Sequence, residues 1–193
     1  MNICVYGASS NELDTSFVTA VEALGHRMAQ RGHNLIFGAG GRGMMGAAAR
    51  GVHAEGGRII GVVPRFFNVD GILFEHCDEM IRTDTMRERK QIMEDRSDAF
   101  VMAPGGVGTF DEFFEILTLR QLGRHTKPLA ILNVNGYYDT LLAFLREGVE
   151  KRFMKAGTLE LFAVFTDVDE MLDYLETTKP TLQDLTELKN ITK

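Results

Sequence analysis

The fold is indicated most clearly by residues 99–122, which read AFVMAPGGVGTFDEFFEILTLRQL. An apolar run at 99–103 is followed by the glycine-rich segment 104–109 and then by an amphipathic segment at 110–122. A short apolar run bounded by turn residues predicts a buried strand, and apolar residues spaced three or four apart predict a helix. The stretch therefore predicts a strand, a glycine-rich loop and a helix in succession.

The same alternation continues outward in both directions. Short apolar runs predict further strands at residues 2–6, 34–37, 58–63, 79–82, 128–133 and 162–166. Helical periodicity predicts helices at 17–28, 44–55, 85–96, 137–150 and 168–176. Strands that alternate with helices of about 10–15 residues are typical of βαβ units. We therefore expect one α/β domain over residues 1–193, with a doubly wound, mainly parallel sheet and helices on both faces. A polar C-terminal tail is expected from about residue 177, with one short helix around Leu182, Leu185 and Leu188.

Composition and charge exclude several classes of protein. Hydrophobic residues make up 45% of the chain and charged residues 25%, which excludes disordered, collagenous and coiled-coil chains. The apolar runs are too short to span a membrane, and the first residues lack the basic region of a secretory signal. The net charge of −6 opposes binding to nucleic acid. Cys4 and Cys77 form neither a disulfide framework nor a zinc set, and the histidines are scattered. We expect a cytoplasmic protein with reduced thiols and no metal site.

In a doubly wound sheet, ligands bind outside the carboxyl ends of the strands, so the loops that follow strands matter most. The loop at residues 7–10 reads Gly-Ala-Ser-Ser. Ser9 followed by Glu12 fits a capping box at a helix start. The same small residues can instead admit a ligand, and Ser9 is then a candidate binding residue.

The loop at residues 38–46 contains Gly38, Gly40 and Gly43, which match the spacing of the dinucleotide fingerprint. This loop follows the second strand, however, and the next strand does not end in the acid that the fingerprint requires. Arg65 stands there and would suit only NADP. We favour a loop in which glycine lets a ligand or neighbouring backbone approach closely.

The third loop, residues 105–109, predicts an anion site. Its glycines expose backbone N–H groups, and the following helix adds unpaired donors and the positive end of its dipole. Phosphate is the expected anion. The alternative is that Thr109 and Glu112 form only a capping box. Glu112, however, shares a helix face with Ile116 and Leu119, and a carboxylate on an apolar face is costly unless it is paired or functional.

Arg89 occupies a similar position in the predicted helix 85–96. Thr85 and Glu88 fit a capping box at the start of this helix. Arg89 lies on the apolar face formed by Met86, Ile92 and Met93. An arginine in that position pairs with a buried acid or meets an anionic ligand, and Glu112 and a phosphate are both candidates. Lys90 either joins that site or is solvated.

Two motifs together resemble those of one family. Residues 104–112 have the form PGGxGTxxE, and residues 86–90 have the form MxxRK. Both are similar to the Lonely Guy family of cytokinin riboside 5′-monophosphate phosphoribohydrolases, which older descriptions call possible lysine decarboxylases. The resemblance covers about residues 2–175 and includes the loops at 7–10 and 38–46 and the segment 132–138.

The resemblance implies a Rossmann-like fold and a homodimer with sites at the subunit boundary. It implies hydrolysis of a nucleoside 5′-monophosphate, either AMP or an N6-modified adenine ribotide, to free base and ribose 5-phosphate without a cofactor. Arg89 and Glu112 would be the catalytic pair. Lys90 would assist them, and Thr118 would touch the substrate. The phosphate would be held by Gly105, Gly106, Val107, Gly108 and Thr109.

The chain departs from many plant members at three places. They have an acidic residue within the segment that here includes Asp70, tyrosine at Val107, and glutamate at Asp111. These departures leave the identity of the base open. A pyridoxal-dependent decarboxylase would need a lysine for the cofactor, and Lys90 has no evident residue beside it to pair the ring nitrogen.

Two further interpretations stay open: a broader nucleotide nucleosidase and a non-catalytic nucleotide carrier.

The helix that begins at residue 110 also predicts oligomerisation. Its apolar residues span most of its circumference, which predicts burial on more than one side. They are Phe113, Phe114, Ile116, Leu117 and Leu119. We expect a two-fold-related subunit to cover the second side, because such dimers are the commonest oligomers.

Overall fold

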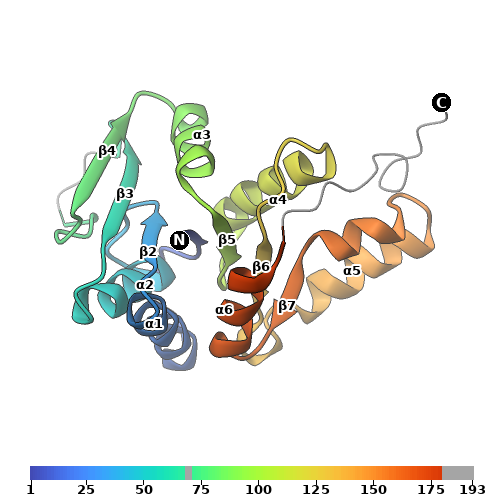
Figure 1. The fold of residues 1–193 in the computed structure, drawn as a ribbon, viewed down its shortest axis with the longest axis horizontal. Coiled ribbons are helices and arrows are strands. Elements are labelled where there is room, and N and C mark those ends of the chain that lie inside the picture. The colour runs from blue at the N-terminus through green and yellow to red at the C-terminus, as the bar shows by residue number, and fades with distance from the viewer. Residues whose placement is uncertain (68–70, 180–193) are drawn as a thin grey trace.

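The computed structural model describes residues 1–67 and 71–179 (Figure 1). Seven strands form one sheet in the order β4-β3-β2-β1-β5-β6-β7, and every pair of neighbours is parallel. The strands are β1 (Asn2–Tyr6), β2 (Asn34–Phe37), β3 (Ile59–Pro64), β4 (Glu79–Thr83), β5 (Ala99–Met102), β6 (Leu129–Leu132) and β7 (Ala163–Phe165). The predicted parallel α/β sheet is confirmed. Asp70 and the helix predicted around Leu182, Leu185 and Leu188 lie outside the described residues.

Helices cover both faces of the sheet. The α-helices are α1 (Thr15–Gln30), α2 (Gly43–Ala54), α3 (Met86–Arg96), α4 (Val107–Gln121), α5 (Asp139–Glu150) and α6 (Val168–Thr177). Helices α1, α2 and α6 lie on one face, and α3, α4 and α5 lie on the other (Figure 1). In β1, Ile3 and Val5 face the first layer, whereas Cys4 and Tyr6 face the second. Strands covered on both sides need apolar residues at every position, which explains the continuous apolar runs. None of the described helices combines the length and the apolarity that a membrane span requires.

The strand order reverses between β1 and β5. From β1 the chain moves outward through β2 and β3 to β4, and α3 then returns it to β5 on the other side of β1. The connections after β1 and β5 therefore diverge, which opens a crevice at the carboxyl ends of these two strands. Backbone hydrogen bonds join the loops here: the Ala8 N–H donates to the Pro104 carbonyl at 3.0 Å, and the Met44 N–H donates to the Ala8 carbonyl at 2.8 Å.

Two capping boxes that were alternatives to a binding role do not form. Helix α1 begins at Thr15 with Asp14 as its cap, so Ser9 and Glu12 form no capping box. The loop after β1 first crosses to α2, and its backbone bonds there keep residues 7–10 out of a helix. Helix α4 begins at Val107 after Gly106, so Thr109 lies inside the first turn and does not cap Glu112.

The capping box predicted in α3 is confirmed in part. The Thr85 hydroxyl accepts from the Glu88 N–H at 3.1 Å. The Glu88 carboxylate, however, accepts from the Asp84 N–H at 2.8 Å instead of from Thr85. The cap fixes where α3 begins and thus where Arg89 lies, one turn further on.

The apolar circumference of α4 is largely covered by its own chain. Phe113, Ile116 and Leu117 are buried in the same core as η2 (Ala156–Leu161) and Phe162. The Phe113 ring packs edge-on against the Phe162 ring with centroids 6.0 Å apart. Three of the five apolar residues of α4 are therefore covered without a second subunit, because the chain returns over α4 after α5. The dimer itself stays a prediction.

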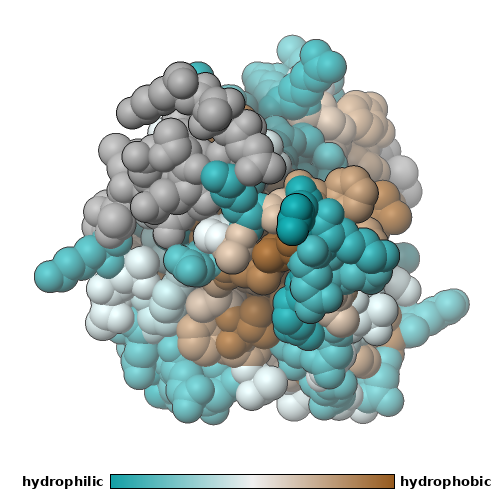
Figure 2. Space-filling view, turned by 90° about the vertical axis from the view of Figure 1, so that its right-hand side faces the viewer, coloured by the Kyte–Doolittle hydropathy of each residue, from teal (hydrophilic) through white to brown (hydrophobic). Residues whose placement is uncertain are grey.

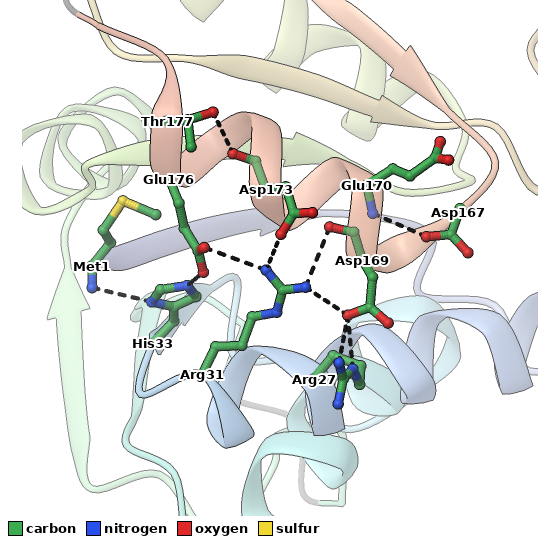
Figure 3. A network of polar contacts seen from close by, with 10 residues as sticks. All are labelled: Met1, Arg27, Arg31, His33, Asp167, Asp169, Glu170, Asp173, Glu176 and Thr177. Atoms are coloured by element: carbon green, nitrogen blue, oxygen red, sulfur yellow. Dashed lines mark hydrogen bonds and ion pairs between the residues drawn. The ribbon is translucent and has the colours of Figure 1, made fainter.

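A network of charges holds α6 against α1 (Figure 3). The Arg31 guanidinium donates to Asp169 at 2.8 Å and to Asp173 at 2.6 Å. Glu176 lies 3.3 Å from Arg31 and 2.7 Å from His33, whose other ring nitrogen lies 3.4 Å from the Met1 amine. The last described helix is therefore tied to the first, at the side of the sheet away from α3 and α4.

Candidate active site

A cavity of about 610 Å³ lies at the crevice between β1 and β5. Its walls come from residues 7–10 after β1, the loop and helix start after β2, the end of β3 with residues 67 and 72–73, α3, and the first two turns of α4. Ser9 is part of the first wall, as expected of a binding residue. The cavity thus lies where the reversal of strand order separates the connections.

Arg89 and Glu112 meet in the wall of this cavity. The Arg89 Nη1 donates to the Glu112 Oε1 at 2.6 Å, and the two side chains are only 7% and 11% exposed. The Arg89 Nε donates to the Val62 carbonyl of β3 at 3.0 Å. Of the two partners predicted for Arg89, the structure shows the acid. Hydrogen bonding on both sides of the guanidinium holds its plane fixed.

Gly38 has a steric reason to be glycine. A β-carbon at this position would collide with the Nη2 of Arg89. Gly43 has a conformational reason, because its φ of 56° lies in the left-handed region and its α-carbon packs against the backbone of residues 8–10. The interpretation of this loop as a place of close backbone approach is confirmed. Arg65, the residue that would suit NADP, is exposed and pairs with Asp84 at 3.1 Å, outside the cavity wall.

Burial changes the pKa of Glu112 and of two nearby groups, Cys4 and Tyr6. It raises the pKa of Glu112 above the usual glutamate value, and the neighbouring Arg89 charge opposes that rise. Burial also raises the pKa of Cys4 to about 12 and that of Tyr6 well above its ordinary value. Both stay protonated near neutral pH, so Cys4 has no thiolate character for nucleophilic attack.

The first turn of α4 presents free hydrogen-bond donors to the cavity. Gly106 caps the helix without a side-chain hydrogen bond. Within the described chain, the N–H groups of Val107, Gly108 and Thr109 have no protein acceptor, since the first helical bond is donated by Phe110 to Gly106. These three residues and Gly106 line the cavity. Free N–H groups at the positive end of a helix dipole form a site for an anion.

Gly105 lies beneath this turn instead of in the cavity wall. Its carbonyl accepts from the Tyr137 hydroxyl at 2.9 Å, and the Ala103 carbonyl accepts from the Tyr138 hydroxyl at 2.7 Å. Two adjacent tyrosines thus anchor the loop from below. Sequence reasoning did not assign them this role, although the Asn135-Gly136 turn before them was visible.

Lys90 and Thr118 are not among the residues that form the cavity wall. The Lys90 amine bonds to Asp111 at 3.1 Å and also pairs with Glu115, so it joins α3 to the outer side of α4. Thr118 is exposed on α4, further along the helix. The structure therefore brings together Ser9, Arg89, Glu112 and residues 106–109 of the predicted site, and it leaves Lys90 and Thr118 outside.

Much of the cavity wall is apolar. It includes the side chains of Met45, Val63, Phe67, Ile72, Leu73 and Met86. Phe67 and Met86 are 46% and 36% exposed, so a ligand could still cover part of their surface. Sequence reasoning did not assign these residues to the site, because they come from separate segments that only the fold brings together.

Comparison with known proteins identifies the family. The model of the family described as possible lysine decarboxylase matches residues 45–175. The cytokinin riboside 5′-monophosphate phosphoribohydrolase LOG2 of Arabidopsis thaliana is 36% identical over 182 residues, which cover 94% of this chain and 85% of that protein. A second relative, the probable cytokinin riboside 5′-monophosphate phosphoribohydrolase LOGL9 of Oryza sativa, is 38% identical. The match covers 90% of this chain and 77% of that protein. The chain belongs to the Lonely Guy family.

Solved structures show the same fold at lower identity. A molybdenum cofactor binding protein of Rippkaea orientalis superposes with a TM-score of 0.69 at 21% identity, covering 91% of this chain and 95% of that one. The molybdenum cofactor carrier protein of Chlamydomonas reinhardtii gives 0.68 at 23%, covering 91% and 95%. These likenesses confirm the Rossmann-like arrangement and carry no argument about ligands.

The two motifs of the Lonely Guy family meet in the cavity of this chain. From PGGxGTxxE come the free donors of α4 and Glu112, and from MxxRK come Met86 and Arg89. The last residue of the second motif, Lys90, points to α4 from outside. In the described residues, no three His, Cys, Asp or Glu side chains are grouped to hold a metal ion. The polar chemistry of the site lies in a carboxylate, a guanidinium and backbone donors.

Proposed function

We propose that this chain hydrolyses the N-glycosidic bond of a nucleoside 5′-monophosphate and releases the free base and ribose 5-phosphate. The observation that carries the proposal is the buried pair of Arg89 and Glu112 in a cavity that is also lined by the start of α4 and by apolar side chains. Family membership supports the reaction, since its relatives are named phosphoribohydrolases of cytokinin riboside 5′-monophosphate.

The arrangement of the cavity supports one orientation of the substrate. The 5′-phosphate would accept hydrogen bonds from the N–H groups of residues 107–109, with Ser9 alongside. The base would lie against Phe67, Met86 and the other apolar side chains. The ribose would then lie between these ends, beside Arg89 and Glu112.

Glu112 would act on the charge that develops at the sugar. As the bond to the base breaks, positive charge grows on the ribose ring, and a nearby carboxylate stabilises it. The same carboxylate can orient a water molecule for attack on the anomeric carbon. Arg89 holds the carboxylate in position through the 2.6 Å hydrogen bond and retains N–H groups that can donate to the sugar.

An adenine with an apolar N6 substituent fits the apolar wall better than an unmodified base does. Burying such a substituent against Met45, Ile72 and Leu73 removes apolar surface from water. We therefore propose an N6-modified adenine ribotide as the preferred substrate, with AMP as a weaker one.

The test is an assay of base release by chromatography with isopentenyladenosine monophosphate, AMP and CMP. We expect the highest kcat/KM for the isopentenyl compound and none for CMP. Comparable rates for all three would favour a broader nucleosidase. Binding of all three without base release would favour a carrier and contradict the proposal.

We also propose a homodimer in the cytoplasm. The cytoplasmic location rests on the free cysteines Cys4 and Cys77. The dimer rests on apolar surface that the chain itself leaves open: Phe144 of α5 is 67% exposed and the nearby Phe153 is 84% exposed. A hydrophobic area is visible in Figure 2 at the end of the molecule where α4 and α5 lie. Phe114 of α4 is half-buried and could extend this surface.

A further inference from the structure

The cavity wall contains a second arginine, Arg42, which the proposed mechanism does not use. Arg42 precedes α2 and is its N-terminal cap residue, in extended backbone conformation with φ −118° and ψ 167°. Its side chain makes no capping hydrogen bond, and within the described residues no carboxylate pairs with it. It is exposed at the cavity. Neither the helix nor an ion pair accounts for this side chain.

Arg42 gives the described wall of the cavity a net positive charge. Among the described residues that line the cavity, the ionisable ones are Arg42, Arg89 and Glu112. Glu112 offsets the charge of Arg89 at 2.6 Å. Lys90, the other cation expected at the site, is neutralised by Asp111 and Glu115 outside the wall. Arg42 therefore supplies the positive charge that is left over.

Arg42 lies between the apolar wall of the cavity and residues 7–10, because the Gly41 N–H before it donates to the Ile72 carbonyl at 2.7 Å. The residue after it, Gly43, packs against the backbone of residues 8–10 and donates to the Asn11 side chain at 3.2 Å. The loop at residues 7–10 is joined in turn to the glycine-rich segment before α4 by the hydrogen bond from the Ala8 N–H to the Pro104 carbonyl. Residues 7–10 thus separate Arg42 from the start of α4 by the width of one loop. The order β2-β1-β5 in the sheet places the three connections in this sequence.

We infer that Arg42 binds the phosphate group of the substrate, opposite the N–H groups of residues 107–109. The inference rests on the proposed function, because it assigns a binding residue to the same site. A phosphate monoester carries up to two negative charges, and a helix N-terminus supplies about half a positive charge. A guanidinium supplies a full charge and can donate two parallel hydrogen bonds to phosphate oxygens. Selectivity for a monophosphate over a nucleoside then depends on Arg42 more than on Arg89.

The experiment compares Arg42→Gln and Arg42→Lys with the wild type and with a matched control, Arg50→Gln. Arg50 lies on the same helix, is exposed and pairs with Glu22 at 3.1 Å, and it is not part of the cavity wall. KM and kcat are measured with AMP. Dissociation constants for ribose 5-phosphate, AMP and adenosine are measured by calorimetry, and thermal melting checks the fold.

We expect Arg42→Gln to raise KM for AMP and the dissociation constants of AMP and ribose 5-phosphate by about tenfold or more, the usual range for a hydrogen bond to a charged group. Adenosine affinity and kcat should stay within about twofold, a difference too small for a lost charged contact. Arg42→Lys should recover most of the affinity because it keeps the charge. Arg50→Gln should behave as the wild type.

Two results with Arg42→Gln would overturn the role of Arg42: an equal loss of affinity for AMP and adenosine, or no loss of affinity for AMP and ribose 5-phosphate. If the wild type still releases base, the proposed function stands in either case. If the wild type binds AMP but releases no base, the proposed hydrolysis fails. The ratio of AMP to adenosine affinity in Arg42→Gln then still decides the role of Arg42. A wild type that binds neither AMP nor ribose 5-phosphate would overturn both.

Discussion

Arg89 and Glu112 are separated by 23 positions in the chain, yet their side chains meet at 2.6 Å and are almost completely buried. They come from α3, which precedes β5 in the chain, and from α4, which follows it. Helix α3 carries the chain back from the edge of the sheet, and α4 begins where the strand order reverses. The pair therefore spans the point at which a doubly wound sheet opens to ligands.

Glu112→Gln is expected to abolish most of the hydrolysis while leaving AMP binding nearly unchanged. The amide keeps the shape and a hydrogen bond but cannot stabilise positive charge on the sugar. Loss of such a contact lowers kcat by about 10²–10³. Steady-state kinetics and calorimetry measure the two quantities. Glu115→Gln, on the same helix but facing Lys90, is the control. Retention of more than about half the activity in Glu112→Gln would contradict a catalytic role, since it is far above that range.

Arg89→Met is expected to destabilise the fold, because it leaves the buried Glu112 carboxylate without a partner. Removing one member of a buried pair costs about 3–5 kcal/mol. The double variant Arg89→Met/Glu112→Gln should regain much of this loss, because the remaining buried group is neutral. The free energy of unfolding in urea measures both. A double variant less stable than Arg89→Met would show that the carboxylate is not the source of the cost.

The acid limb of the pH profile of kcat is expected above the usual pKa of a glutamate. Glu112 must be ionised to act, and burial raises its pKa. Activity therefore falls as the pH drops through this raised value. Arg89 opposes the rise, so Arg89→Gln should move the acid limb to still higher pH. Measuring kcat against pH for both proteins checks the sign. A limb that moves to lower pH in Arg89→Gln would contradict the assignment to Glu112.

Tyr137→Phe is expected to raise KM for AMP by a few fold, the effect of about 1 kcal/mol for one hydrogen bond. Its hydroxyl holds the Gly105 carbonyl, so its loss loosens the turn that presents the phosphate donors. Tyr174→Phe is the matched control, because Tyr174 lies on α6, away from the cavity. Equal effects of the two variants on KM would rule out a positioning role for Tyr137.

Phe144→Asp is expected to convert the proposed dimer, with a mass of about 43 kDa from two chains of 21.5 kDa, into a monomer. Phe144 is 67% exposed in the single chain, so the charge costs the monomer little. Leu117, by contrast, is 5% exposed and a charge there would disturb the core. Light scattering measures the mass. Phe66→Asp, 62% exposed near the opposite edge of the sheet, should leave the dimer intact. A wild-type monomer at assay concentration would refute the dimer.

Much of this protein follows from local sequence patterns. The buried strands were predictable because a strand covered on both faces is a continuous apolar run, and β1 and β2 begin and end where the pattern predicts. The unpaired N–H groups at the start of α4 were predictable because a helix start after glycines needs no distant residue to form. Glu112 and Arg89 were visible as charges on apolar helix faces, which are costly without a partner.

The tertiary structure decided which charges belong to the site. Periodicity places a side chain on a helix face, but it does not say what packs against that face. Lys90 follows Arg89 directly, yet one turns toward Asp111 and the other toward the cavity. Arg42, Phe67 and Met86 join the same cavity only because the order β2-β1-β5 and the return of α3 bring their segments together. The sequence alone determined the local elements and the glycine-rich turn before α4, because these depend on neighbours along the chain. The charge balance and the apolar pocket depend on contacts between distant segments, and only the fold determines those.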